Sequence, residues 1–272
     1  MTLHKFYQIL QQFAPTQLSN DYCQRYGAYD NSGILIDTGK EVKSVLFSLD
    51  FSYAAVESAI KMGVNAIVTH HPAIYGAISR LDNNNALDKK VMLCIEHGIS
   101  VISMHLNLDV AKGGIDESLM QGVRACANGK GTIQPPENVV ICDALEDGVG
   151  YGRAYDVVKT DMVSLAAAIK LRFGTDRVLT YEHTDKPVTR VASFCGSGAD
   201  EKSVLFAKNQ GAQVFISADF KHHVLLLAKE LGVSVIALTH YSAENYGFEK
   251  YFEKISSQVN LPCVWHTDKD LL

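Results

Sequence analysis

Short apolar runs that alternate with helical segments limit most strongly what this chain can fold into. The runs VLFSL, AIVT and ISVISM stand in the first half of the sequence, and VASF, VFIS and VIAL stand in the second. Between them, residues with helical spacing end near a glycine, as helix C-termini often do. The predicted helices include 52–62, 88–97, 161–173, 201–210 and 222–231. Alternation of this kind predicts an α/β fold.

The composition of the 272 residues is that of a folded globular protein, with 47% hydrophobic and 20% charged residues. The formal net charge of −5 provides no basic field for phosphate backbones, so nucleic acid is a poor candidate partner. The longest apolar runs, such as 45–49 and 233–238, are far shorter than the roughly 20 residues of a membrane-spanning helix. We therefore expect no membrane span.

The N-terminus and the cysteines indicate a reduced cytoplasmic protein. Apolar residues at positions 3, 6, 7, 10 and 13 follow helical spacing rather than a signal-peptide core, which predicts an amphipathic helix ended by Pro15. The six cysteines are scattered and form no CxxC pair, which is typical of cytosolic thiols that act as small buried hydrophobic residues. No cysteine is expected to bind metal.

The two halves of the sequence resemble each other. VESAIKMGVNAIVTHH and VLFAKNQGAQVFISADFKHH both read as a helix, a glycine, an apolar strand and paired histidines. CIEHGISVISMHLNLD and AKELGVSVIALTHYSAEN also match, and each has one histidine just after the strand. Any two helix–strand units share part of this pattern, but histidines at the ends of all four strands favour a duplication with pseudo-twofold symmetry.

A middle stretch from 129 to about 187 predicts the connection between the halves, because it contains GKGTIQPPEN and the glycine-rich DGVGYGR. No low-complexity linker separates them. We expect two similar, intertwined three-layer α/β/α halves, 1–128 and 129–272, that pack closely with a metal site in the crevice between them.

Paired histidines follow the strand that ends at Thr69. His70 and His71 stand where the chain leaves the sheet, which is where sites form in α/β folds. At such a turn, two neighbouring imidazoles can converge on one crevice and serve two ions. Taken alone, an HH pair is more often two polar loop residues, so further residues must decide.

Two more strand ends carry a histidine and a carboxylate four residues apart. His105 and Asp109 follow one strand, and His240 and Glu244 follow another. On a helix this spacing places both side chains on one face. A single such pair is common as a solvated ion pair, but three elements of this kind at strand ends favour a metal site.

Several motifs together resemble the NIF-three-like dinuclear metal-centre family, whose members are often named GTP cyclohydrolase I type 2 homologues. The resemblance covers nearly the whole chain. Its motifs are DNSG at 30–33, THHP at 69–72, HLNLDVAKGG at 105–114, GYGR at 150–153, CGSGADEKS at 195–203 and THYSAE at 239–244.

The resemblance implies a set of metal ligands and an assembly. The implied ligands are His70, His71, Asp109, His240 and Glu244. Glu244 corresponds to the carboxylate that bridges both ions, and His105 to a histidine beside them that is an additional ligand or a proton shuttle. The family also implies a homo-oligomer, a hexamer assembled as a ring.

Nitrogen and oxygen ligands without a thiolate fit two divalent ions of zinc, iron, manganese, nickel or cobalt. Two ions about 3.5–4 Å apart would activate water for attack on a phosphoryl or amide-like centre. The leading hypothesis is a metal-dependent hydrolase acting on a small nucleotide or related heterocycle, although no guanine-reading pocket can be identified. The alternative is a non-enzymatic metal-binding or regulatory ring.

Weaker signals surround these motifs. The segment 191–206 reads as strand, glycine turn and helix, so it is either a tight turn or a phosphate site at a helix start. Asp219 and His223 either support the metal ligands or belong to a helix capped at Asp219. Asp30 and Asn31 read as a turn, which the family pattern puts near the site.

Overall fold

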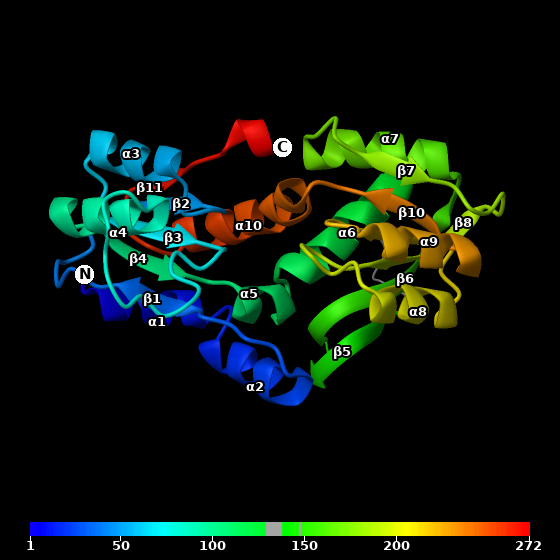
Figure 1. Ribbon diagram of the computed structural model, residues 1–272, viewed down its shortest axis with the longest axis horizontal. Helices are drawn as coiled ribbons and strands as arrows, with labels where there is room; N and C mark the ends of the chain where they lie inside the picture. Colours follow the sequence, from blue (N-terminus) through cyan, green and yellow to red (C-terminus); the bar gives the residue numbers. More distant parts are fainter. Residues whose placement is uncertain (129–137, 147) are drawn as a thin grey trace. The chain divides into compact units, whose positions relative to one another are not determined.

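The computed structural model describes residues 1–128, 138–146 and 148–272 (Figure 1). These residues divide into two units. Unit 1 contains Met1–Ala111 and Phe248–Asp270, and unit 2 contains Lys112–Gly247 and Leu271–Leu272. Each unit has its own mixed sheet with helices, so the predicted α/β class is confirmed.

Unit 1 is built on a five-stranded sheet. Its strands are β1 (Gly33–Ile36), β2 (Val45–Ser48), β3 (Ala66–Thr69), β4 (Ser100–Ser103) and β11 (Cys263–Trp265), in the order β1-β4-β3-β2-β11. All neighbouring pairs are parallel except β1, which runs antiparallel to β4 at the edge. The three central strands are buried along their whole length, as expected for a parallel sheet covered on both faces.

Helices cover both faces of this sheet. The helices of unit 1 are α1 (Leu3–Gln11), α2 (Thr16–Tyr26), α3 (Tyr53–Met62), α4 (Ala86–His97), α5 (Leu106–Val110) and the part of α10 (His240–Ser256) that begins at Phe248. On one face, α3 and α4 bury their apolar side chains against Leu46 and Ile67. On the other, Phe47 packs against Phe248 and Phe252 of α10.

Unit 2 is built on a six-stranded sheet. Its strands are β5 (Val140–Glu146), β6 (Val149–Thr160), β7 (Leu179–Tyr181), β8 (Val188–Ser193), β9 (Val214–Ser217) and β10 (Ser234–Ala237), in the order β5-β6-β8-β9-β10-β7. Its helices are α6 (Ile115–Asn128), α7 (Met162–Phe173), α8 (Glu201–Asn209), α9 (His222–Leu231) and the start of α10. Apolar residues of α8 and α9 pack around Phe215, and α6 packs on β6 with α7 beside it.

Both sheets contain the same arrangement of four strands. In unit 1, β2, β3 and β4 are parallel neighbours and β1 pairs antiparallel with β4. In unit 2, β8, β9 and β10 are parallel neighbours and β7 pairs antiparallel with β10. This correspondence agrees with the sequence repeat, whereas the pseudo-twofold relation and the boundary at residue 128 stay predictions.

The five helices predicted by residue range agree with the structure to within two residues at each end. The predicted N-terminal helix is present, but it ends at Gln11 rather than at Pro15, which precedes the next helix, α2. The middle stretch differs from expectation. The segment GKGTIQPPEN falls almost entirely on 129–137, outside the described residues, but the glycine-rich part predicted as a turn enters the long strand β6. Gly152 of this strand has φ +73 and lies against the ring of Phe194, where a side chain would collide, so the glycines serve packing within the sheet.

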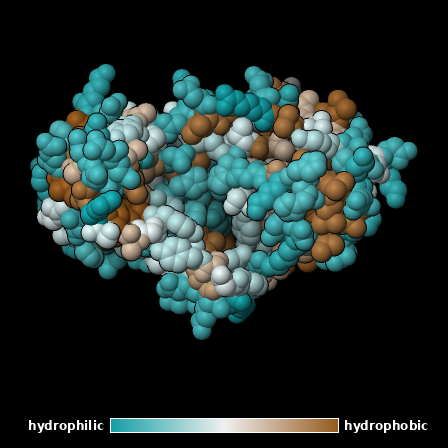
Figure 2. Space-filling view, viewed as in Figure 1, coloured by the Kyte–Doolittle hydropathy of each residue, from teal (hydrophilic) through white to brown (hydrophobic). Residues whose placement is uncertain are grey.

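None of the helices in the described part of the chain combines the length and the hydrophobicity of a membrane span. On the face drawn in Figure 2, hydrophilic side chains predominate and hydrophobic ones gather in separate patches.

Candidate metal centre

Three imidazoles gather at the carboxyl edge of the unit 1 sheet. His70 and His71 directly follow β3, and His105 follows the neighbouring parallel strand β4. The ring centroid of His70 lies 5.0 Å from that of His71 and 5.2 Å from that of His105. One ring nitrogen from each residue lies within 4.8 Å of the other two, so the three could hold a metal ion. Adjacent parallel strands end at the same edge, which explains the convergence.

Each of these imidazoles has an oxygen atom bound at Nδ1. The oxygens belong to the carbonyl of Met104 for His70, at 2.8 Å, and to Asp50 for His71 and Asp30 for His105, both at 2.7 Å. A carbonyl oxygen or a carboxylate can only accept, so Nδ1 carries the proton and Nε2 carries the lone pair. In metal sites, a histidine that binds the ion through one ring nitrogen usually donates the N–H of the other to a carboxylate or a carbonyl oxygen, as these three do.

Asp109 of α5 brings a carboxylate to the same place. Its Oδ1 atom lies 3.4 Å from Nε2 of His70, and the two side chains are 8% and 0% exposed. This separation is longer than a good N–H···O bond, and both atoms are electron-pair donors once Nδ1 holds the proton. Two buried donors at such a distance repel each other unless a cation or proton lies between them, so the pair fits a metal-binding role.

Asp30 is itself held firmly. Its Oδ2 atom accepts hydrogen bonds from the hydroxyls of Ser19 and Ser32, at 2.5 and 2.6 Å. Burial acts to raise the pKa of Asp30, but the hydrogen bonds from His105, Ser19 and Ser32 outweigh it and hold the pKa well below its usual range. The Ser32 hydroxyl also accepts the backbone N–H of His105 at 3.1 Å. The DNSG turn therefore orients His105.

Unit 2 presents a second cluster at the start of α10. Nε2 of His240 lies 3.1 Å from Oε2 of Glu244, one turn later on the same helix, and the Glu244 side chain is only 4% exposed. Nδ1 of His240 lies 2.6 Å from Oδ2 of Asp219. Asp219 has φ +54, and α9 begins at His222 after Lys221, so the prediction of a helix capped at Asp219 is wrong. Asp219 instead holds the imidazole.

The two carboxylates make His240 a strong base in the metal-free protein. Burial acts to lower the pKa of His240, but Glu244 and Asp219 outweigh it and raise the pKa to about 9. A proton between His240 and Glu244 thus occupies the position that a cation could take. His223, which the sequence placed near the site, lies exposed with Nε2 4.0 Å from Glu201.

The CGSG loop between β8 and α8 approaches this cluster closely. Gly196 has φ +53, and a Cβ atom there would collide with Oε1 of Glu244 and lie 3.3 Å from Nε2 of His240. The side chain of Asp200 caps α8 by accepting the N–H of Ser203 at 2.7 Å. The predicted strand-to-helix turn is confirmed, and its glycine leaves room for the Glu244 carboxylate.

Replacing Gly196 with alanine is therefore expected to displace Glu244 and to lower the metal content of the protein. The new Cβ adds a collision to a left-handed backbone that alone disfavours alanine by about 1 kcal/mol or more. Gly211→Ala is the matched control, because Gly211 has φ +72 with open space around its Cα. Thermal melts and elemental analysis check both variants. Equal metal loss in the two would show that contact with Glu244 is not the cause.

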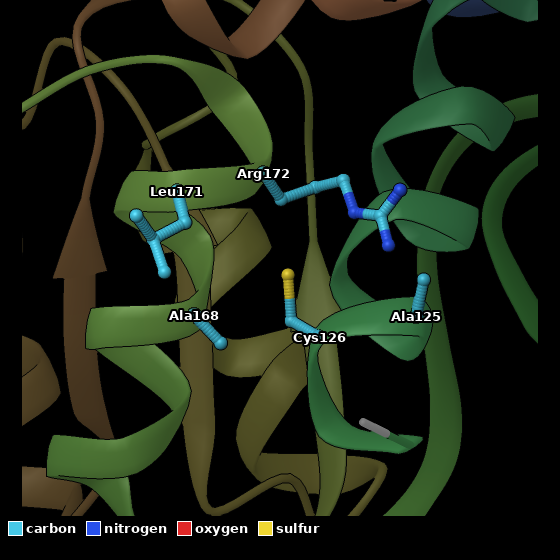
Figure 3. A pocket seen from close by; sticks show the side chains of 5 residues that line it. All are labelled: Ala125, Cys126, Ala168, Leu171 and Arg172. Carbon is cyan, nitrogen blue, oxygen red and sulfur yellow. The ribbon is translucent and has the colours of Figure 1, made fainter. Parts of the chain in front are cut away.

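A cavity of about 390 Å³ in unit 2 has a different chemical character. It is lined by Ala125 and Cys126 of α6 and by Ala168, Leu171 and Arg172 of α7, and the side chains of Cys126 and Arg172 lie at it (Figure 3). Burial raises the pKa of Cys126 to about 11, although Arg172 opposes the shift. None of the described residues that line it belongs to the two histidine clusters, so this cavity is separate from the candidate centre.

Comparison with known proteins adds to this geometry. The profile of the family described as Duf34/NIF3 (NGG1p interacting factor 3) matches residues 1–269. A GTP cyclohydrolase 1 type 2 homolog from Clostridium perfringens is 26% identical over 272 residues, covering 99% of this chain and 97% of that protein. NGG1-interacting factor 3 of Saccharomyces cerevisiae is 26% identical over 247 residues, 82% of either chain. The structure of reduced HcgD from Methanocaldococcus jannaschii superposes with a TM-score of 0.80 at 26% identity, covering 97% of both chains.

Proposed function

The chain belongs to the Duf34/NIF3 family, and from this premise we propose that it binds two divalent metal ions and acts as a hydrolase on a small nucleotide or related heterocycle. One observation carries the proposal. Four histidines each have an oxygen atom at Nδ1, which leaves Nε2 to face a buried carboxylate or another imidazole. This donor set fits a metal centre better than a set of structural ion pairs.

We place ligands from both units around one pair of ions, as the family resemblance implies. They are His70, His71 and Asp109 from unit 1 and His240 and Glu244 from unit 2, with Glu244 as the bridging carboxylate. The match to the Duf34/NIF3 family supports this assignment, because it extends over residues 1–269 and so includes the proposed ligands of both units.

The donor atoms are nitrogen and oxygen, which suits zinc, iron, manganese, nickel or cobalt. When bound, two such ions would supply Lewis-acid activation of water and of the substrate. Asp50, Asp30 and Asp219 accept hydrogen bonds at Nδ1 and so orient the imidazoles. His105 stands beside the ligands as an additional ligand or as a group that carries a proton.

The nucleotide class of the substrate is supported by the names of relatives such as the Clostridium perfringens protein. The yeast relative is named for interaction with another protein, which favours the alternative of a non-enzymatic metal-binding or regulatory assembly. The hexameric ring and the cytoplasmic location stay predictions that accompany either function.

Metal content per chain tests the proposal. Protein purified without a histidine tag or added metal should contain about two transition-metal equivalents by inductively coupled plasma mass spectrometry, as a two-metal site requires. Removal of the metal with a chelator should abolish hydrolysis of a responsive nucleotide or phosphoester, and readdition should restore it. Content near zero even after reconstitution would overturn the metal site, and full occupancy without hydrolysis across the panel would favour the non-enzymatic alternative.

A further inference from the structure

Two tyrosines beside the unit 1 histidines are unusually exposed. Tyr29 follows α2, and Tyr75 lies in the loop after β3. Their side chains are 59% and 50% exposed, although burial of an aromatic ring is strongly favourable. Exposed aromatic rings next to a candidate active centre are available for a ligand.

Hydrogen bonds hold the two tyrosines in place. The hydroxyl of Tyr29 donates to the carbonyl oxygen of Tyr75 at 2.9 Å, and the hydroxyl of Tyr75 donates to the carbonyl oxygen of Tyr29 at 3.1 Å. Their rings meet edge to face, with centroids 5.1 Å apart and planes at 83°. The side chain of Asn31 also donates to the carbonyl oxygen of Ile74 at 2.6 Å. Because both rings are ordered in advance, a ligand would lose little affinity to fixing them.

The pair lies directly against the histidine cluster. The centroid of the Tyr75 ring is 6.5 Å from that of His105, with the planes at 89°. Tyr29 immediately precedes Asp30, which holds Nδ1 of His105. A molecule resting on these rings would therefore have another part within reach of the metal ligands His70 and His71.

We propose that Tyr29 and Tyr75 form a platform on which a flat aromatic ring of the substrate, a nucleobase or related heterocycle, stacks. This inference rests on the proposed function, since it assigns the residues that would bind the heterocycle. Stacking uses the π-face that all bases share. Both tyrosine hydroxyls already donate to backbone carbonyls, so the platform selects for planarity rather than for one particular base.

A purely structural role for the pair, bracing two loops around His105, makes a different prediction. Phenylalanine keeps the ring but removes the hydroxyl that braces the partner loop. If bracing were the only role, Tyr29→Phe and Tyr75→Phe would behave like the alanine variants. A stacking platform instead keeps most of its affinity for a planar ligand with phenylalanine and loses it with alanine.

The test measures binding of guanosine, uridine and ribose to chelator-treated, metal-free protein by saturation-transfer NMR and calorimetry. We expect both nucleosides to bind better than ribose, and Tyr29→Ala or Tyr75→Ala to weaken nucleoside binding by about tenfold or more. The phenylalanine variants keep the ring but lose a hydrogen bond that orders it, so their affinity should lie between that of the wild type and that of the alanine variants. Val163→Ala, which changes a residue that is 74% exposed in unit 2, should leave binding unchanged.

Three results would overturn the platform: ribose binding as well as the nucleosides, alanine variants binding as wild type does, or phenylalanine variants failing as the alanine variants do. Thermal melts confirm that each variant is folded.

Metal content is measured on separate samples and should be unaffected by the tyrosine substitutions. If nucleosides bind but the protein does not contain two metals, the proposed function is contradicted and the platform stands. If the protein contains two metals but nucleosides do not bind, the platform is contradicted and the metal site stands.

Discussion

Glutamine in place of Glu244 is expected to lower the bound metal to one equivalent or less per chain. The substitution keeps the size of the side chain but removes its charge and replaces one electron-pair donor with an N–H donor. Loss of an outer-shell partner already weakens metal binding about 10–100-fold, so loss of a bridging ligand should exceed that. Elemental analysis of the purified variant gives the stoichiometry.

Glu253→Gln is the matched control for this experiment. Glu253 lies on the same helix, α10, and is exposed to solvent. Its substitution by glutamine removes the same negative charge as Glu244→Gln does. Its metal content should equal that of the wild type. Unchanged stoichiometry in Glu244→Gln would remove Glu244 from the ligand set, whereas equal losses in both variants would point to an effect on the helix.

Asparagine in place of Asp116 is expected to destabilise unit 2 by about 3–5 kcal/mol, the usual cost of breaking a buried ion pair. Asp116 is fully buried, pairs with the guanidinium of Arg153, and accepts the backbone N–H groups of Gly152 and Cys195 at 3.1 Å each. Arg153 is 1% exposed, so its charge would remain in the interior without the Asp116 carboxylate that pairs with it. A loss of this size is a large part of the about 5–15 kcal/mol that typically stabilises a domain.

Urea denaturation of metal-free protein measures this loss, and Asp156→Asn provides the comparison. Asp156 pairs with Arg190 in the same unit, but the two side chains are 38% and 16% exposed. Exposed pairs contribute only about 0–1 kcal/mol, so the control should unfold close to wild type. If Asp116→Asn unfolds at the same urea concentration as Asp156→Asn, the buried pair is not a major source of stability.

The regular part of the fold could be predicted because it follows local rules. Apolar strands buried on both faces and helices that end at glycine are visible in a single sequence. The strands β5 and β6 were not predicted. Most residues of β5 are exposed or half-buried, and β6 contains two glycines, Gly150 and Gly152, near its start. Those glycines mark close packing against residues such as Phe194, which only the tertiary structure reveals.

The histidines and their carboxylates could be proposed from spacing and family resemblance, but the groups that orient them could not. Asp50 was missed, although it follows β2 at the same edge of the sheet as His71, and that position could have pointed to it. The role of Asp219 depends on a left-handed backbone that places its carboxylate against His240. Gly196 matters through an approach to Glu244, a residue 48 positions away in the sequence.

The division of the chain between the units also sets the order in which they can form during translation. Unit 1 starts at the N-terminus, but its sheet needs β11, which pairs with β2, and its core needs Phe248 and Phe252. All of unit 2 up to Gly247 leaves the ribosome before those residues do. Residues 1–111 are therefore synthesised before unit 2 but complete their sheet after it, and the edge of β2 stays exposed until β11 has been made.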